Sequence, residues 1–142
     1  MRTACLLLVV GALLAQGCGT QSCSLVDAPS GIEFDVTATF AASPGLLRVH
    51  ICIEGRCVDR PVGPSDPPGS FVADPSLDGG GAVWVGVTIR DAAGAFVMRA
   101  RRRVQLQPYM PNGAGCDPTR YRAHVATTEA GALTQAGSSA GG

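Results

Sequence analysis

The sequence predicts an all-β fold, an antiparallel β-sandwich of about seven short strands with two disulfides. Apolar and polar residues alternate over several short runs, and clusters of Gly, Pro, Asp and Ser separate these runs. No stretch after residue 17 has a helical period. The chain has 142 residues, 46% of them hydrophobic and 15% charged, which suits one packed domain with accessory segments.

The alternation locates each expected strand. In residues 32–38 the side chains of Ile32, Phe34 and Val36 share one face, and in residues 47–53 the odd-numbered positions are apolar. Residues 91–94 have the composition of a type I turn that a glycine closes. The expected strands cover residues 32–38, 47–53, 56–62, 70–73, 83–89, 95–107 and 121–127, with long loops over residues 61–81 and 108–118.

The first 17 residues have the pattern of an export signal. Arg2 gives a positive start, and residues 5–14 are an uncharged apolar run. As a helix this run spans about half of a bilayer core, which suits a signal peptide and not a membrane span. Leu14-Ala15-Gln16-Gly17-Cys18 resembles the lipobox of bacterial lipoproteins, in which a diacylglyceryl group alkylates the cysteine. Ala15 stands where the motif usually has Leu, so cleavage and simple secretion is the alternative.

The cysteines also favour lipidation. Cys5 leaves with the signal peptide, and a lipid on Cys18 leaves four cysteines for two disulfides in an oxidising compartment. A two-residue turn at Glu54-Gly55 sets Cys52 opposite Cys57 in a non-hydrogen-bonded pair, where a hairpin disulfide fits. We then expect Cys23 and Cys116 to pair with each other.

Four segments follow from these patterns. We expect a lipoprotein signal peptide at 1–17, a tether at 18–30, a β-sandwich domain at 31–129 and a flexible tail at 130–142. The tether and the end of the tail are small and polar, as flexible segments are. The 11 arginines balance 11 acidic residues, so the net charge does not argue for a nucleic-acid partner.

Three groups of residues resemble small actinobacterial lipoproteins of uncharacterised function with an Ig-like or prealbumin-like β-sandwich. These are Cys23-Ser24, the hairpin at residues 49–57 and the segment at residues 108–116. The strand pair around residues 91–94 is also similar to carboxypeptidase-regulatory-like modules, which share the sandwich architecture. Neither resemblance implies a reaction.

The hairpin register places His50 opposite Asp59, on the strand face that also has Cys52 and Cys57. One interpretation is a solvent-facing ion pair beside a disulfide. The alternative is a metal or redox site made of His50, Asp59, Cys52 and Cys57. We find no serine in a strand-to-helix turn and no zinc framework, and we predict neither catalytic residues nor a cofactor. His124 is expected at the surface of the last strand.

An arginine stripe is the most distinctive feature of the later strands. Arg99, Arg101 and Arg103 fall on one strand face with Arg90 across the turn, while Arg102 interrupts the alternation and indicates a bulge or a strand end. The stripe is either an anion-binding site for lipid headgroups or cell-wall polymers, or a solvated face that discourages edge pairing. Trp84 is out of phase with its valine neighbours, and we expect it to pack under the 61–81 loop rather than form a binding platform.

These observations together predict an exported, non-catalytic protein with a binding or scaffolding role at the cell envelope. A lipid on Cys18 would hold it at the outer face of the bacterial cytoplasmic membrane. The expected partners are the membrane and an envelope protein or polymer, and no nucleic acid is expected. The alternatives are a soluble secreted protein and the metal or redox protein described above.

Overall fold

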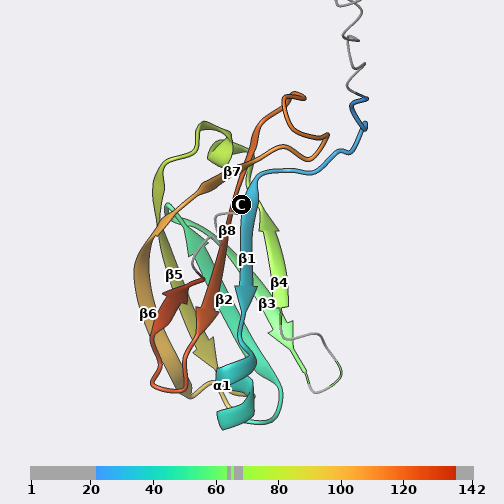
Figure 1. Ribbon diagram of the computed structural model, residues 1–142. Coiled ribbons are helices and arrows are strands. Elements are labelled where there is room, and N and C mark those ends of the chain that lie inside the picture. Colours follow the sequence, from blue (N-terminus) through green and yellow to red (C-terminus); the bar gives the residue numbers. More distant parts are fainter. Residues whose placement is uncertain (1–21, 64, 66–68, 137–142) are drawn as a thin grey trace, which may run out of the picture.

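The computed structural model describes residues 22–63, 65 and 69–136, which form a sandwich of two β-sheets (Figure 1). Sheet A contains β1 (Gly31–Asp35), β4 (Gly69–Ala73), β7 (Gln107–Tyr109), β8 (Arg120–Thr127) and β9 (Leu133–Gln135). Sheet B contains β2 (Leu47–Ile53), β3 (Arg56–Val62), β5 (Ala82–Arg90) and β6 (Phe96–Gln105). A short helix, α1 (Thr37–Ala42), and a 3-10 turn, η1 (Pro75–Gly79), complete the described elements.

The predicted fold class is confirmed, with two differences in detail. The described part of the chain has nine strands rather than about seven. Sheet A has the order β4-β1-β8-β7 with β9 also paired to β8, and sheet B has the order β3-β2-β5-β6. Every pairing is antiparallel except that of β1 with β8, which is parallel.

The core lies between the two sheets because each strand turns its apolar positions to the same side. The four odd-numbered apolar residues of β2 are no more than 2% exposed, and those of β5 no more than 8%. Ile32 and Phe34 of β1 and Val125 of β8 close this core from sheet A. A register slip of one residue would turn all of these side chains to water, so burial fixes the register of sheet B.

Helix α1 is the element that the alternation missed. The strand predicted over residues 32–38 ends at Asp35, whose carboxylate accepts a hydrogen bond from the Thr37 N–H at 2.8 Å and turns the chain. The Thr37 hydroxyl bond lowers the pKa of Asp35 more than burial raises it, and the Thr37 N–H and the nearby His124 lower it further. His124 is half-buried on β8 rather than a fully exposed surface residue.

Side-chain contacts join both open edges of the sandwich. Arg56 of β3 binds Asp74, which follows β4, at 2.6 Å, and also contacts the Ser76 hydroxyl. Burial raises the pKa of Asp74, but hydrogen bonds from the Ser76 hydroxyl and N–H, with the Arg56 guanidinium, outweigh it and hold the pKa below its usual value. The chain thus ties the edge of sheet B to the edge of sheet A through an ionised carboxylate.

On the opposite edge, Arg102 lies neither at a bulge nor at a strand end, contrary to the prediction from the sequence. The ladder between β5 and β6 continues through it, opposite Val85, and the irregularity lies instead between Ile89 and Arg90. Arg102 faces the other sheet, and its guanidinium donates to the Leu133 carbonyl of β9 at 3.2 Å. It breaks the polar alternation because it reaches across the sandwich edge, not because the strand ends there.

Strand β9 lies in the segment that we expected to be a flexible tail. Residues 133–135 pair with β8, and Leu133 is only 4% exposed. Gln105 and Gln135 exchange two hydrogen bonds between β6 and β9, at 2.9 and 2.6 Å. The sandwich therefore extends past residue 129, the predicted end of the domain.

Candidate functional site

The outer face of sheet B gathers the candidate residues in rows that cross the four strands. His50 of β2 lies opposite Asp59 of β3 and Thr88 of β5, and Thr88 lies opposite Arg99 of β6. The next row contains the pairs Cys57–Cys52, Cys52–Gly86 and Gly86–Arg101. The pleat places these residues outward because their chain neighbours fill the core.

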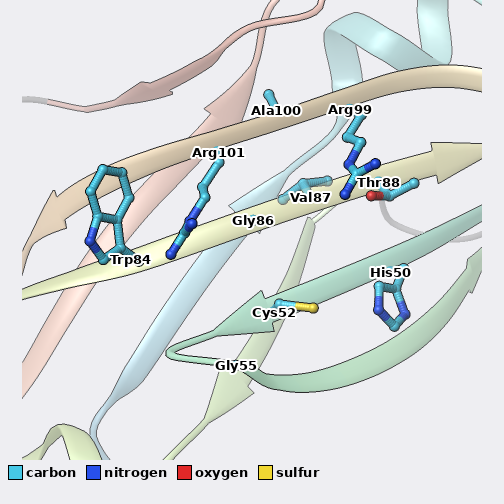
Figure 2. A pocket seen from close by; sticks show the side chains of 10 residues that line it. All are labelled: His50, Cys52, Gly55, Trp84, Gly86, Val87, Thr88, Arg99, Ala100 and Arg101. Atoms are coloured by element: carbon cyan, nitrogen blue, oxygen red, sulfur yellow. The ribbon is translucent and has the colours of Figure 1, made fainter.

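These rows form an open groove of about 480 Å³ on sheet B (Figure 2). Gly86 forms part of its floor, and a Cβ there would stand 3.9 Å from the Cβ of Cys52, in ordinary contact. The glycine is therefore not required by the backbone, and its effect is to keep the floor low between Trp84 and Thr88. His50 and Cys52 border the groove on one side, and Arg99 and Arg101 border it on the other.

Trp84 is where the structure corrects the sequence-based expectation. It is 42% exposed on the outer face and does not lie buried under the 61–81 loop. The guanidinium of Arg101 lies 4.6 Å from the ring centroid, a cation–π contact that holds both side chains at the rim of the groove. The backbone N–H of Trp84 donates to the Glu54 carboxylate at 2.5 Å, which joins the turn between β2 and β3 to β5 at the Trp84 end of the groove.

The structure brings the four predicted arginines onto one face and adds a fifth. Arg90 lies 3.5 Å from the Phe96 ring centroid and donates to the Gly94 carbonyl at 2.7 Å. Arg48, which the sequence analysis did not single out, lies opposite Arg90. Its position two residues before His50 in an alternating strand was the signal that could have found it. The arginine face is hereafter defined as Arg48, Arg90, Arg99, Arg101 and Arg103.

Asp59, the carboxylate that borders the arginine face beside His50, pairs with His50 and not with an arginine. The ion pairs in the described ranges are His50–Asp59, Arg56–Asp74 and Arg120–Asp78, and none includes an arginine of this face. The chain as a whole is neutral, so this face concentrates positive charge locally.

The structure confirms the predicted register, which pairs His50 with Asp59 and Cys52 with Cys57, but it does not support a metal site there. His50 Nδ1 lies 2.8 Å from Asp59 Oδ1, and the two side chains are 44% and 82% exposed. The ligand atoms of His50, Cys52 and Cys57 lie within 4.8 Å of one another. The two sulfurs are joined in a disulfide, however, and a metal ligand would have to be a thiolate. Thr88 lies opposite His50, but no hydrogen bond joins these two described residues.

Both predicted disulfides are present. Cys52 and Cys57 bridge β2 and β3 with their Cα atoms 4.0 Å apart, and Cys23 bridges to Cys116 with a Cα separation of 5.8 Å. Disulfides form and persist in oxidising surroundings, so the described domain belongs to an extracytoplasmic compartment. No helix among the described residues has both the length and the hydrophobicity that a membrane crossing needs.

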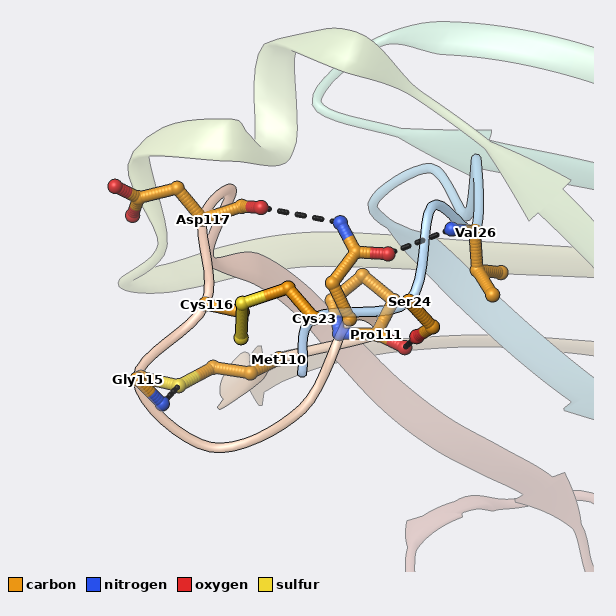
Figure 3. Close-up of a disulfide and its surroundings, with 9 residues drawn as sticks. Cys23, Ser24, Val26, Met110, Pro111, Gly115, Cys116 and Asp117 are labelled. Carbon is orange, nitrogen blue, oxygen red and sulfur yellow. Dashed lines mark hydrogen bonds between the residues drawn. A yellow bond between two sulfur atoms is a disulfide. The ribbon is translucent and has the colours of Figure 1, made fainter. Parts of the chain in front are cut away.

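The Cys23–Cys116 bond belongs to a clasp between the predicted tether and the 108–118 loop (Figure 3). The Asn112 side chain accepts from the Val26 N–H at 2.6 Å and donates to the Asp117 carbonyl at 3.0 Å. The backbone carbonyl of Asn112 accepts from the Ser24 N–H at 3.1 Å. The second half of the predicted tether is therefore fixed to the domain. Cys18 and the signal sequence lie outside the described residues.

No family model, curated protein or solved structure matches this chain significantly. The resemblance to small actinobacterial lipoproteins thus stays a prediction, and the evidence for a function comes from the outer face of sheet B.

Proposed function

We propose that this protein is a lipid-anchored, non-catalytic binding domain of the bacterial cell envelope. The anchor is supported by the lipobox-like residues ending at Cys18 and by the even number of remaining cysteines, all four of them paired. Four residues separate Cys18 from Cys23, so an anchored chain reaches at most about 18 Å from its lipid to the clasp. The domain would stay close to the membrane surface.

The observation that carries the binding role is the arginine face with its groove. Five arginines share one sheet face with a half-exposed Trp84, and no carboxylate among the described residues pairs with them. An unpaired cationic face beside an exposed aromatic ring is suited to an anionic ligand. A metal or redox protein is the weaker candidate because the sulfurs it needs are bonded to each other.

The anchor is tested by Cys18→Ser, with Cys5→Ser as the matched control. Loss of the thiol at Cys18 removes the acceptor of the diacylglyceryl group, so the variant should leave the membrane fraction or fail to be processed. Cys5→Ser changes only the apolar signal run and should behave as the wild type. Intact-mass spectrometry of the mature protein reports lipid and cleavage site together. A Cys18→Ser protein that is processed normally and stays on the membrane contradicts the anchor.

The binding face is tested with the exported Cys18→Ser protein and isolated envelopes. Arg99→Ala/Arg101→Ala should lower the fraction that sediments with envelopes, and added salt should have a similar effect on the parent protein. Arg122→Ala removes one charge and is the comparison for Arg99→Ala and Arg101→Ala taken singly, because Arg122 lies on β8 of sheet A, the other sheet. Equal sedimentation of all variants would exclude this face as the binding surface.

A further inference from the structure

We infer that the arginine face binds an extended acidic glycan that lies along β6, with a sugar ring against Trp84. This inference rests on the proposed function, because it names the ligand of the same face.

The charges recur along one strand. Arg99, Arg101 and Arg103 occupy every second position of β6, which is the edge strand of sheet B. Outward residues two apart in a strand are separated by about 6.8 Å, so the three arginines span about 14 Å in a line. A small anion contacts one or two of them, whereas a chain with anionic groups at regular intervals contacts all three.

Single contacts with these arginines are weak. Arg99, Arg101 and Arg103 are exposed, and in the described structure no ion pair holds any of their guanidinium groups in place. Exposed charge pairs contribute little individually because water and salt screen them. Several such contacts along one polymer add without a new cost of association, so a repeating ligand gains most from this face.

Trp84 and Gly86 favour a carbohydrate backbone over other polyanions. Trp84 is 42% exposed next to Arg101 and opposite Arg103, so an apolar surface lies within the cationic row. Gly86 leaves the sheet uncovered between Trp84 and Thr88, and a ring seated there meets little obstruction. The apolar face of a sugar ring packs on the part of the indole that Arg101 leaves exposed, while its carboxylate or phosphate groups accept from the guanidinium groups.

The orientation of the domain argues against the headgroups of the bilayer as the ligand. The clasp lies at one end of the sandwich, and β5 and β6 run along its length (Figure 1). An anchor less than about 18 Å from the clasp therefore sets this end toward the membrane. The row Arg103, Arg101, Arg99 then runs away from the bilayer, and a flat lipid surface meets only its first member.

The test uses the exported Cys18→Ser protein, so that no lipid on the protein supplies membrane binding. The probes are a long oligogalacturonate, the same oligomer fully methyl-esterified, the galacturonate monomer, and vesicles of phosphatidylglycerol and phosphatidylcholine in equal parts. Binding is followed by calorimetry and by the fluorescence of Trp84, the single tryptophan of the chain. We expect the oligomer to bind at least about tenfold more tightly than the monomer, and also more tightly than the vesicles at an equal concentration of negative charge, while the ester should not bind measurably.

Variants assign the binding to the face. Arg99→Ala/Arg101→Ala should weaken oligomer binding by about tenfold or more, and Arg122→Ala on β8 of the other sheet should leave it unchanged. Trp84→Leu should weaken binding of the oligomer while keeping its salt dependence, since it removes the ring and no charge. Vesicles that bind as well as the oligomer, or a monomer that matches it, would overturn the glycan and leave the binding face in place. A protein that binds none of the anionic probes would overturn the proposed binding face as well.

Discussion

His50 and Ile51 are neighbours in β2 with opposite surroundings. Ile51 is 1% exposed in the core, whereas the His50 side chain is 44% exposed in its pair with Asp59. Ile51→Ala should lower the free energy of unfolding by about 2–5 kcal/mol, because it removes buried methyl groups and leaves a cavity. His50→Ala should cost less than about 1 kcal/mol. Denaturant midpoints at unchanged slope rank the two, and a larger loss at His50 would mean that its ring is coordinated or buried.

The glycine after η1 provides a second test at this scale. Gly80 has φ +66°, and a Cβ there would meet the Tyr121 ring at 2.4 Å, whereas a Cβ at Gly79 meets nothing within 4 Å. Gly80→Ala should therefore destabilise the protein by about 2 kcal/mol or more through backbone strain and overpacking. Gly79→Ala is the matched control and should change stability little. Thermal or urea unfolding of the pair would contradict this reading if both variants behaved alike.

Single residues were predictable where the chain geometry left one choice. A two-residue turn at Glu54-Gly55 allows only the register that pairs Cys52 with Cys57 and His50 with Asp59, and the structure has it. Trp84 was predicted on the correct face of its strand, but it was wrongly expected to be buried under the 61–81 loop. Period two tells which side of a sheet a residue occupies, and it does not tell what lies above that side.

At the scale of elements, the errors come from segments where local patterns conflict. Residues 32–38 alternate as a strand does, yet Asp35 ends β1 and a helical turn follows. Side-chain bonds to the backbone compete with strand pairing, and alternation alone does not register this competition. Strand β9 was missed because three residues are too few for a period, and its pairing to β8 depends on tertiary contacts.

The two disulfides should differ in their effect on stability. The Cys23–Cys116 bond closes a loop with a sequence separation of 93, and the Cys52–Cys57 bond one of 5. Chain entropy gives a loss of about 4.5 kcal/mol for the double alanine variant of the long pair and about 2 kcal/mol for the short pair. Unfolding by denaturant under non-reducing conditions measures both. The reverse order would show that the hairpin bond supports contacts beyond its own strands.

The contact of Arg56 on β3 with Asp74 and Ser76 should respond to acid. Because the pKa of Asp74 is held below 3.8, its carboxylate stabilises the fold above that pH, and this contribution is lost as the pH falls through the lower folded value. Asp74→Asn should cost about 1–3 kcal/mol at neutral pH, because the charged acceptor for Ser76 and Arg56 is gone. The gap between variant and wild type should close as the pH falls through the lowered pKa of Asp74. A gap that is independent of pH would show that ionisation of Asp74 does not matter.

For the whole molecule, sequence patterns predicted the sandwich, both disulfides and the shared face of four arginines. They did not predict the groove, because its shape depends on four strands meeting side by side. Arg48 joins the arginine face only through its pairing with Arg90, and Arg101 meets Trp84 only across β5 and β6. A ligand site of this kind is a property of the assembled sheet rather than of any motif in the chain.

The proposed anchor and the clasp together predict one orientation of the whole domain relative to the bilayer. With the proposed lipid on Cys18, the short segment to Cys23 and the Cys23–Cys116 bond should hold the 108–118 loop near the lipid surface, with the turn at residues 91–94 at the far end of β6. A ten-residue strand such as β6 is about 33 Å long, well within the range over which energy transfer distinguishes positions. Dyes attached at Ala114→Cys and Ala93→Cys should therefore differ in transfer to acceptors in the bilayer, with Ala114 the closer.

The clasp is tested within the same measurement. Cys23→Ser/Cys116→Ser frees the tether from the loop, so the difference between the two dye positions should shrink while the protein stays on the membrane. Cys52→Ser/Cys57→Ser removes a disulfide of sheet B that does not contact the tether, and the difference should persist. If the two dye positions give equal transfer in the wild type, the domain has no preferred orientation. The arginine face would then be free to lie against the lipid headgroups, and the orientation of the domain would no longer favour a glycan over these headgroups.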